Sequence, residues 1–372
     1  MDLLLTDEQR LLQDSVAKMM AQAGGVKRTR ALRGKDGGFD RVVHERMGQE
    51  AWFGLLVSQD DGGLGLGLTE LGLVLMEAGK VLAPEPIAAA VITAYAISSG
   101  KNASRVADLA ADLAADLVAG IVEGRTLVMP ALGLDHAERS GGVKASTADG
   151  GKTWRLDGVC DGVPLAGHCD GFVVAAEGGG GAPLFYVARS VEGFMIASRA
   201  TVDGRPFGRL TFDDVKAGSL IVGPEPGVEA QRRLRDLLLF AEAAELVGLM
   251  TAALDITVEY LKTRKQFGKP IGSFQALQHR AVDDFAKIVS ARSFLFQVAA
   301  QGLDISSSMA SALKAHAAAE ALDVCKSAIQ MHGGIGFTEE CDIGLYLKRA
   351  MWLSAWLGNE AHHRARYASL MG

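Results

Sequence analysis

The sequence predicts an α+β protein with three regions, because the spacing of its apolar residues changes twice along the chain. Residues 1–122 show the three-to-four spacing that is typical of helices. Residues 123–226 shift toward alternation and are punctuated by glycine, which is typical of antiparallel strands. The helical spacing returns over residues 227–372. We therefore expect an N-terminal helical domain, a middle antiparallel β domain and a C-terminal four-helix bundle.

The N-terminal region contains two helix signals. Thr6 and Gln9 are the two residues of a predicted capping box at the start of the first helix. A buried helix is predicted over residues 68–76, where leucine, valine and methionine predominate. The preceding residues 60–65 follow no clear strand and do not complete a GxGxxG motif, so we interpret them as a turn and not as a nucleotide loop.

The middle and C-terminal elements follow from the same patterns. Strands are predicted over residues 154–158, 171–176, 184–188 and 210–215, with a glycine-rich hairpin connection at residues 177–183. Long helical segments are predicted over roughly residues 229–263, 274–302, 306–331 and 342–369.

Length and composition limit the class of protein. A chain of 372 residues with 49% hydrophobic residues can bury a large core in two or three domains. Its net charge of −6 argues against a general nucleic-acid-binding protein. No uninterrupted apolar run reaches the roughly 18–20 residues of a spanning helix, and the N-terminus does not resemble a signal peptide. We expect a cytoplasmic protein with no nucleic-acid partner and no membrane span.

The cysteines and histidines do not suggest a metal site. Neither a CxxC pair nor a metal-like spacing with histidine is present, and we expect the cysteines to be reduced and structural. His362 and His363 are adjacent, so on a helix they point to different faces. The four cysteines are Cys160, Cys169, Cys325 and Cys341.

Residues 264–275 combine cations, aromatic rings and a Gly/Pro break directly after a long helical segment. Four cations lie within residues 262–269, together with Phe267 and Gly268. This combination suits a diphosphate and an adenine ring. A basic last turn followed by glycine and proline also ends ordinary helices, so the combination, and not any one residue, favours an anion site.

A second segment, residues 330–338, contains the pair Gly333 and Gly334 after His332. Paired glycines mark ordinary loops, and they also let a backbone approach a cofactor closely with its N–H groups free.

The first segment resembles the RxxFGxxIxxFQ signature of the acyl-CoA dehydrogenase family, and the second resembles the family's QxxGGxGF motif. The two motifs occur in the family's order and at its usual spacing, and the resemblance extends over essentially the whole chain. In that family both segments hold FAD. The resemblance implies FAD as the cofactor and Arg264, Phe267, Phe274, Gln275, Gln330, Met331, His332, Gly333 and Gly334 as residues that bind it.

The reaction implied by the resemblance is α,β-dehydrogenation of an acyl-CoA thioester. A carboxylate removes the α-proton while a hydride leaves the β-carbon for the flavin N5. The resemblance also implies electron-transfer flavoprotein as the electron acceptor and a role in lipid or sterol catabolism. In the family the Arg264 segment reaches FAD across a subunit interface. We therefore expect a homodimer or tetramer, or a hetero-oligomer with a related subunit.

The sequence departs from the family at the catalytic base. Most members place a glutamate after the last arginine of the bundle, and alignment through residues 347–349 puts Gly358 there. Other members place the base on the first bundle helix, where alignment through residues 247–249 puts Leu239. Nearby acids are the remaining candidate bases, namely Glu360, Asp236 and Glu242.

Each candidate base has a structural alternative. Asp236 follows three arginines, so a surface ion pair would also explain it. Glu242 lies among alanines, where a charge requires a partner or a function. Glu360 begins a helix, where an acid is favoured by the helix dipole alone.

The middle region departs from the family as well. Residues 131–135 and 162–166 replace two elements that contact the flavin in most members. Residues 163–166, 170–174 and 202–206 resemble a compact bacterial branch of the family, in which some members pair with a different subunit. Three hypotheses follow: an FAD-dependent acyl-CoA dehydrogenase for a bulky or unusual thioester, a catalytically degenerate partner subunit, and a non-redox flavin- or CoA-binding protein.

Overall fold

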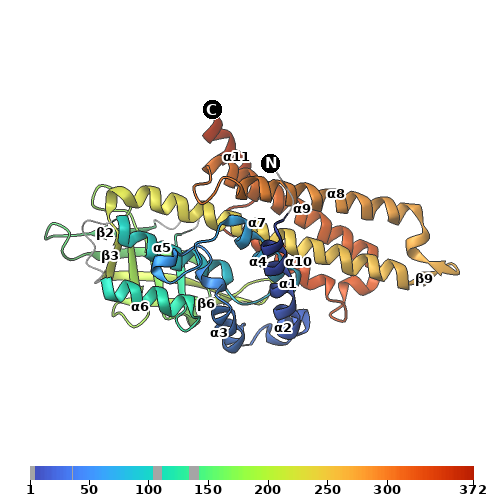
Figure 1. Ribbon diagram of the computed structural model, residues 1–372, viewed down its shortest axis with the longest axis horizontal. Coiled ribbons are helices and arrows are strands. Elements are labelled where there is room, and N and C mark those ends of the chain that lie inside the picture. The colour runs from blue at the N-terminus through green and yellow to red at the C-terminus, as the bar shows by residue number, and fades with distance from the viewer. Residues whose placement is uncertain (1–4, 36, 104–110, 134–141) are drawn as a thin grey trace. The chain divides into compact units, whose positions relative to one another are not determined.

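The computed structural model describes residues 5–35, 37–103, 111–133 and 142–372 (Figure 1). The chain divides into two compact units. Unit 1 comprises Met1–Arg33, Leu68–Ala83 and Leu239–Gly372, and unit 2 comprises Gly34–Gly67 and Pro84–Leu238. Helix α7 (Pro224–Thr263) contributes to both units. Helices, then strands, then helices follow in the predicted order, which confirms the α+β class. The predicted domain boundaries stay a prediction.

Unit 2 contains two four-stranded sheets, ordered β1–β4–β5–β8 and β2–β3–β7–β6. The predicted strands correspond to β3, β4, β5 and β7, and the glycine-rich connection joins β4 to β5 in an antiparallel hairpin. The first sheet consists of β1 (Val128–Ala131), β4 (Gly171–Ala175), β5 (Leu184–Ala188) and β8 (Ser219–Val222). The second consists of β2 (Val143–Ser146), β3 (Arg155–Pro164), β6 (Phe194–Ala200) and β7 (Pro206–Lys216).

One strand pair departs from the antiparallel prediction, because β1 runs parallel to β4. The two strands are separated by β2 and β3 in the chain, so no hairpin sets their relative direction. Strand β1 lies at the edge of its sheet, where Pro130 is tolerated although it has no backbone N–H. The other pairs between named strands in unit 2 are antiparallel.

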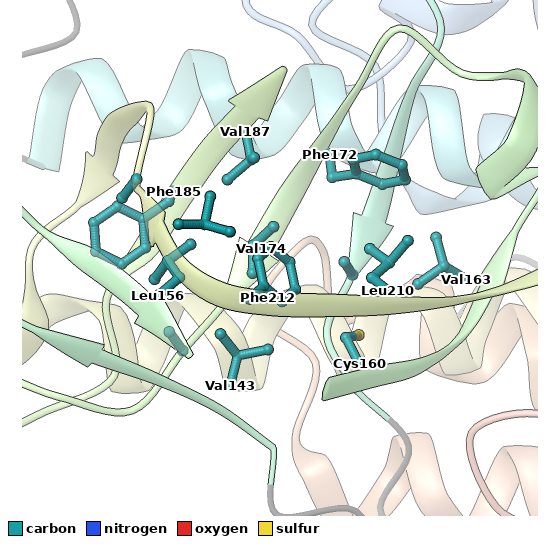
Figure 2. Close-up of a cluster of buried hydrophobic side chains, with 14 of the residues drawn as sticks. Val143, Leu156, Cys160, Val163, Phe172, Val174, Phe185, Val187, Leu210 and Phe212 are labelled. Atoms are coloured by element: carbon teal, nitrogen blue, oxygen red, sulfur yellow. The ribbon is translucent and has the colours of Figure 1, made fainter. Parts of the chain in front are cut away.

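Apolar side chains from both sheets form one core (Figure 2). Leu156, Leu210 and Phe212 come from the second sheet and meet Phe172 and Phe185 from the first. This shared core is what holds the two sheets face to face.

Cys160 lies in the same core (Figure 2). Burial raises its pKa to about 12, so its thiol stays protonated at neutral pH. All four cysteines are free thiols, and Cys169 and Cys325 are also buried, in agreement with a structural role.

The remaining helices of unit 2 are α3 (Arg41–Gln49), α5 (Ile87–Ala103) and α6 (Ala111–Val122), and α5 packs against β1 and β8. His44 of α3 is fully buried, and neither of its ring nitrogens has a hydrogen-bond partner among the described residues. Its ring stacks on Phe53 with 4.4 Å between centroids. Burial, and then the charge of Arg41, lowers the pKa of His44 to about 3.

We expect His44→Leu to reduce the loss of stability in acid. The unfolded chain protonates His44 near its ordinary pKa of 6.5, whereas the folded chain keeps it neutral down to about pH 3. Between these values the unfolded state binds more protons, so lowering the pH costs the wild type on the order of 1 kcal/mol per pH unit. Urea unfolding between pH 7 and 4.5 measures the slope. His279→Leu, at an exposed site on α8 (Gln275–Ala299), is the control. Equal slopes for wild type and His44→Leu would contradict the prediction.

Unit 1 is helical. The capping box is confirmed: the Gln9 N–H donates to Thr6 Oγ1 over 3.2 Å, and the Thr6 N–H donates to Gln9 Oε1 over 3.0 Å. Helix α1 packs against α4, and α9 packs against α8, α10 and α11. The helices are α1 (Asp7–Gln22), α2 (Gly25–Leu32), α4 (Leu68–Lys80), α8 (Gln275–Ala299), α9 (Ser307–His332), α10 (Ile343–Ala355) and α11 (Glu360–Met371).

The last predicted helical segment is wrong as one helix, because it is divided into α10 and α11. Leu357 and Gly358 adopt φ angles of 55° and 113°, which end a right-handed helix. Asn359 then caps α11 by accepting a hydrogen bond from the His362 N–H over 3.0 Å. We call residues 356–359 the α10–α11 turn.

By length and composition, α7 is the one helix of the described residues that could cross a membrane. Of its most apolar 18-residue window, 89% is buried in the structure, which is typical of the core helix of a folded protein.

Candidate functional site

A two-stranded hairpin directly follows α7, formed by β9 (Lys265–Gln266) and β10 (Lys269–Pro270). Its turn has Phe267 at φ 53° and Gly268 at φ 79°, as tight two-residue hairpin turns require. Glycine adopts this conformation readily, but Phe267 is strained by it, and its side chain is 91% exposed. A strained backbone that presents an aromatic ring to solvent indicates a contact surface.

Arg264 joins α7 to this hairpin. Its N–H donates to the Tyr260 carbonyl over 2.9 Å, and its carbonyl accepts from the Ile271 N–H over 2.8 Å. Its guanidinium is exposed and makes no hydrogen bond or ion pair with the rest of the described chain. The backbone is therefore fixed while the charge is available for an anion.

The start of α8 completes this basic and aromatic cluster. The ring of Phe274 lies 6.1 Å from that of Phe267, nearly perpendicular to it. The Lys269 ammonium lies 4.4 Å from the centroid of Phe274. Gln275, the first residue of α8, is exposed beside them.

The glycine motif lies where α9 ends. Gly333 adopts φ 66°, and a side-chain carbon at Gly333 or Gly334 would meet no atom within 4 Å. Gln330 is exposed, whereas Met331 and His332 are buried. The backbone of the two glycines is thus open to an approaching ligand.

One aromatic contact brings the two motifs together. The rings of Tyr260 and His332 stack with 4.5 Å between centroids. Tyr260 lies one turn before Arg264, and His332 precedes Gly333 directly. Both motifs therefore occupy the same end of the unit 1 helices, where β9 extends past α7 and α8 (Figure 1).

These residues fit the dinucleotide that the sequence predicts. Arg264 supplies an unpaired positive charge for a diphosphate, Phe267 an exposed apolar ring, and Gly333 an open backbone. The assignment of individual residues to FAD stays a prediction. Within the described residues, no group of three histidine, cysteine or acidic side chains could hold a metal ion.

Asp236, the first of the candidate bases, is fully buried on α7. Its Oδ2 accepts a hydrogen bond from Arg232 Nη1 over 2.9 Å, one helical turn earlier. Arg232 also pairs with Glu229. Asp236 therefore forms an ion pair, but it is buried and does not lie at the surface, where the sequence alternative placed it.

Glu360 is the first residue of α11, and its carboxylate lies 2.8 Å from Arg364 Nη2, one turn later. Its side chain is 42% exposed. Its surroundings are those of an acid at a helix N-terminus.

The surroundings of Glu242 differ from those of Asp236 and Glu360. It is buried on α7, its Oε2 is in contact with Lys314 Nζ, and its Oε1 has no hydrogen-bond partner among the described residues. Whether any of the three acids is the base stays a prediction.

Comparison with known proteins decides the family. Residues 6–103 match the acyl-CoA dehydrogenase N-terminal domain, and residues 240–371 match the acyl-CoA dehydrogenase C-terminal domain. The chain belongs to the acyl-CoA dehydrogenase family. The resemblance recognised in its motifs is thereby confirmed, and with it the family's class of activity, oxidation of a CH–CH bond.

Individual relatives agree over nearly the full length. The chain is 30% identical to the acyl-CoA dehydrogenase IpdE2 of Mycolicibacterium smegmatis, over 95% of this chain and 96% of that protein. A variant of the Tcur3481-Tcur3483 steroid ACAD superposes with a TM-score of 0.87 at 29% identity, covering 98% of each chain. The ChsE4-ChsE5 complex of Mycobacterium tuberculosis has a TM-score of 0.86 at 25% identity, covering 100% of this chain and 99% of that chain.

The two positions at which the motif alignment expects the family's base hold no carboxylate in this chain. Leu239 is fully buried on α7, and Gly358 lies in the α10–α11 turn in a conformation that favours glycine. Of the two segments that replace the family's flavin-contacting elements, residues 134 and 135 lie outside the described residues.

Two residues beside the α10–α11 turn were not predicted as part of the site: Lys314 was missed, and His363 was considered only as a metal ligand. Both are fully buried. The signal for Lys314 was present, since a lysine at an otherwise apolar position of a helix requires a buried acid as its partner.

Proposed function

We propose that this chain is a subunit of an FAD-dependent acyl-CoA dehydrogenase that introduces an α,β double bond into an acyl-CoA thioester. The main support is that the Arg264 and Gly333 motifs meet at one end of unit 1 through the Tyr260–His332 stack. FAD, when bound, supplies the redox chemistry by accepting the hydride at N5.

The residues of the chain have distinct tasks in this proposal. Arg264 pairs with the diphosphate, and Phe267 covers an apolar ring of the cofactor. Gly333 and Gly334 allow the backbone to approach it closely. A carboxylate must accept the α-proton at a position from which water is excluded.

The substrate we propose is a bulky CoA thioester from lipid or sterol breakdown. One relative supports this, since a solved structure that the chain resembles is named a steroid ACAD. We further propose that the reaction takes place in the cytoplasm with electron-transfer flavoprotein as the electron acceptor.

A second candidate function is that of a partner subunit that completes a flavin site without supplying the base. Leu239 and Gly358 stand where the family places its carboxylates, and Asp236 and Glu360 are held in ion pairs. The two solved relatives, each named for two components, favour an assembly with a related chain. The non-redox binding hypothesis has no comparable support.

We expect Arg264→Ala to weaken FAD binding about 10- to 100-fold, because the diphosphate loses a charge-assisted contact of about 1.5–3 kcal/mol. Titration of the apoprotein with FAD, followed by the visible spectrum, measures this. The exposed Arg292→Ala on α8 is the matched control and should bind FAD like the wild type. Equal affinity of Arg264→Ala and wild type would remove Arg264 from the site.

One experiment separates the two candidate functions. The chain is expressed alone and with a related subunit, and its visible spectrum is followed while acyl-CoA thioesters are added. Bleaching of the flavin by the chain alone supports the dehydrogenase. A colourless chain that gains FAD only with its partner supports the partner role, and a flavin that no thioester bleaches in either preparation contradicts the proposed dehydrogenation.

A further inference from the structure

The buried carboxylate of Glu242 is only half satisfied by its surroundings. Its side chain is 2% exposed, Oε2 contacts Lys314 Nζ, and Oε1 has no hydrogen-bond partner among the described residues. A buried carboxylate oxygen without a partner costs free energy, so such an atom calls for an explanation. The residues around Glu242 and Lys314 indicate why this oxygen is left without a partner.

Lys314 connects Glu242 to the α10–α11 turn. Besides the carboxylate, its ammonium donates to the carbonyls of Leu353 and Trp356, the latter over 3.1 Å. Its three protons are thereby used by one acceptor on α7, one on α10 and one in the α10–α11 turn. Glu242 therefore lies next to the turn that contains Gly358, where most of the family carries its base.

The same turn is also held by His363. His363 Nε2 lies 3.1 Å from the Leu357 carbonyl, and Nδ1 lies 3.4 Å from Ser311 Oγ. A carbonyl only accepts, so Nε2 carries the proton, and Nδ1 accepts from the Ser311 hydroxyl. Ser311 in turn accepts from Arg366 Nη1 over 2.6 Å. The turn is thus fixed by side chains from α9 and α11.

The charges around the pair are also defined. Lys314 faces Glu242 from α9. On α11, His363 is close enough to feel the charges of Lys314 and Arg366. Burial, followed by the charge of Lys314, lowers the pKa of His363 to about 3, so this ring is neutral. Burial also lowers the pKa of Lys314 to about 7, while contact with the carboxylate favours the charged ammonium.

We propose that Glu242 is the carboxylate that accepts the α-proton, through Oε1, and that Lys314 is the positioning residue that holds it beside the α10–α11 turn. This inference rests on the proposed acyl-CoA dehydrogenase function. Glu242 lies three residues after Leu239 and so shares its face of α7. The base would then lie about one helical turn after Leu239, which aligns with one of the family's base positions. It would also lie beside the turn that contains Gly358, which aligns with the other.

The step balances with the proposed cofactor. The α C–H bond breaks and its proton goes to Glu242 Oε1, while the β-hydrogen leaves with an electron pair to FAD. The acyl group is oxidised by two electrons as its α,β double bond forms. Lys314 keeps its proton throughout and takes no part in the bond changes.

The first measurement needs no cofactor. Urea unfolding of the apoprotein is compared for Glu242→Gln, Lys314→Met and the double variant. Removing Lys314 alone leaves a buried unpaired carboxylate, so Lys314→Met should lower the urea midpoint more than the double variant does. Additive effects of the two substitutions would show that the side chains do not hold one another and would overturn the positioning part of the proposal.

The second measurement distinguishes catalysis from mere stability. With FAD content matched, α-hydrogen exchange of octanoyl-CoA and of a steroid side-chain CoA thioester is followed in D2O by mass spectrometry. Glu242→Gln should lower the exchange rate about 10²–10⁴-fold. Asp284→Asn is the matched control, because Asp284 is another buried carboxylate of unit 1 with an unpartnered oxygen, and it should keep the wild-type rate.

The pH profile tests Lys314. Removing a neighbouring positive charge raises the pKa of a carboxylate, so Lys314→Met should move the half-maximal exchange rate to higher pH, and Lys314→Arg should restore it in part. Exchange by Glu242→Gln at the wild-type rate would overturn this proposal and leave the proposed function intact. A wild type that exchanges no α-hydrogen, alone or with a partner subunit, would overturn both.

Discussion

Gly358→Glu, which places a glutamate where the motif alignment expects the family's base, is expected to destabilise the chain and to add no dehydrogenase activity to that of the wild type. A side-chain carbon at Gly358 would lie 2.5 Å from His362 Cδ2 and 2.8 Å from His363 Nε2. His363 is buried and bonded to the Leu357 carbonyl, so it cannot move aside without breaking that bond. The φ angle of 113° adds backbone strain for any residue except glycine.

Backbone strain and overpacking together should lower the free energy of unfolding by several kcal/mol. Strain contributes about 1–3 kcal/mol and overpacking a similar amount. Urea unfolding measures the loss, and flavin bleaching by acyl-CoA tests for activity. Gly344→Ala is the control, because its added carbon would come no closer than 3.9 Å to another atom outside its own helix. A Gly358→Glu chain that is as stable as wild type, or that dehydrogenates faster, would show that the turn can still accept the family's base.

The elements and motifs that could be predicted from the sequence have local signals. The capping box at Thr6 and the strand over residues 184–188 depend on residues a few positions apart, and both are confirmed. The motifs at Arg264 and Gly333 were likewise recognisable one at a time. That they meet depends on the Tyr260–His332 contact, which no short segment encodes.

What the sequence did not reveal depends on distant contacts. Lys314 and Glu242 are 72 positions apart, and nothing in either segment identifies the other as its partner. The parallel pairing of β1 with β4 similarly joins strands separated by two others. The division of α10 from α11 had a local cue in Gly358, but helical periodicity on both sides concealed it.

The second large effect concerns a close contact between the backbones of α4 and α7. A side-chain carbon at Gly248 of α7 would lie 2.0 Å from the Met76 carbonyl oxygen, and one at Gly79 of α4 would lie 2.4 Å from the Glu245 carbonyl oxygen. Both obstacles are backbone atoms, so no rotamer change relieves them. The two helices can accept a larger residue only by separating.

We therefore expect Gly248→Ala to cost about 3 kcal/mol or more in the free energy of unfolding, at or above the upper end of overpacking in a buried core. Gly72→Ala on α4 is the control: its nearest neighbour would be Phe240 Cζ at 3.4 Å, an ordinary contact, and alanine favours a helix over glycine by about 1 kcal/mol. Urea unfolding should place Gly248→Ala well below wild type and Gly72→Ala at or above it. Helix α7 carries both Glu242 and Tyr260, and Tyr260 stacks on His332 beside the glycine motif. A displaced α7 should therefore also lower the affinity of Gly248→Ala for FAD. A Gly248→Ala protein with wild-type stability would mean that the two helices are not in such close contact.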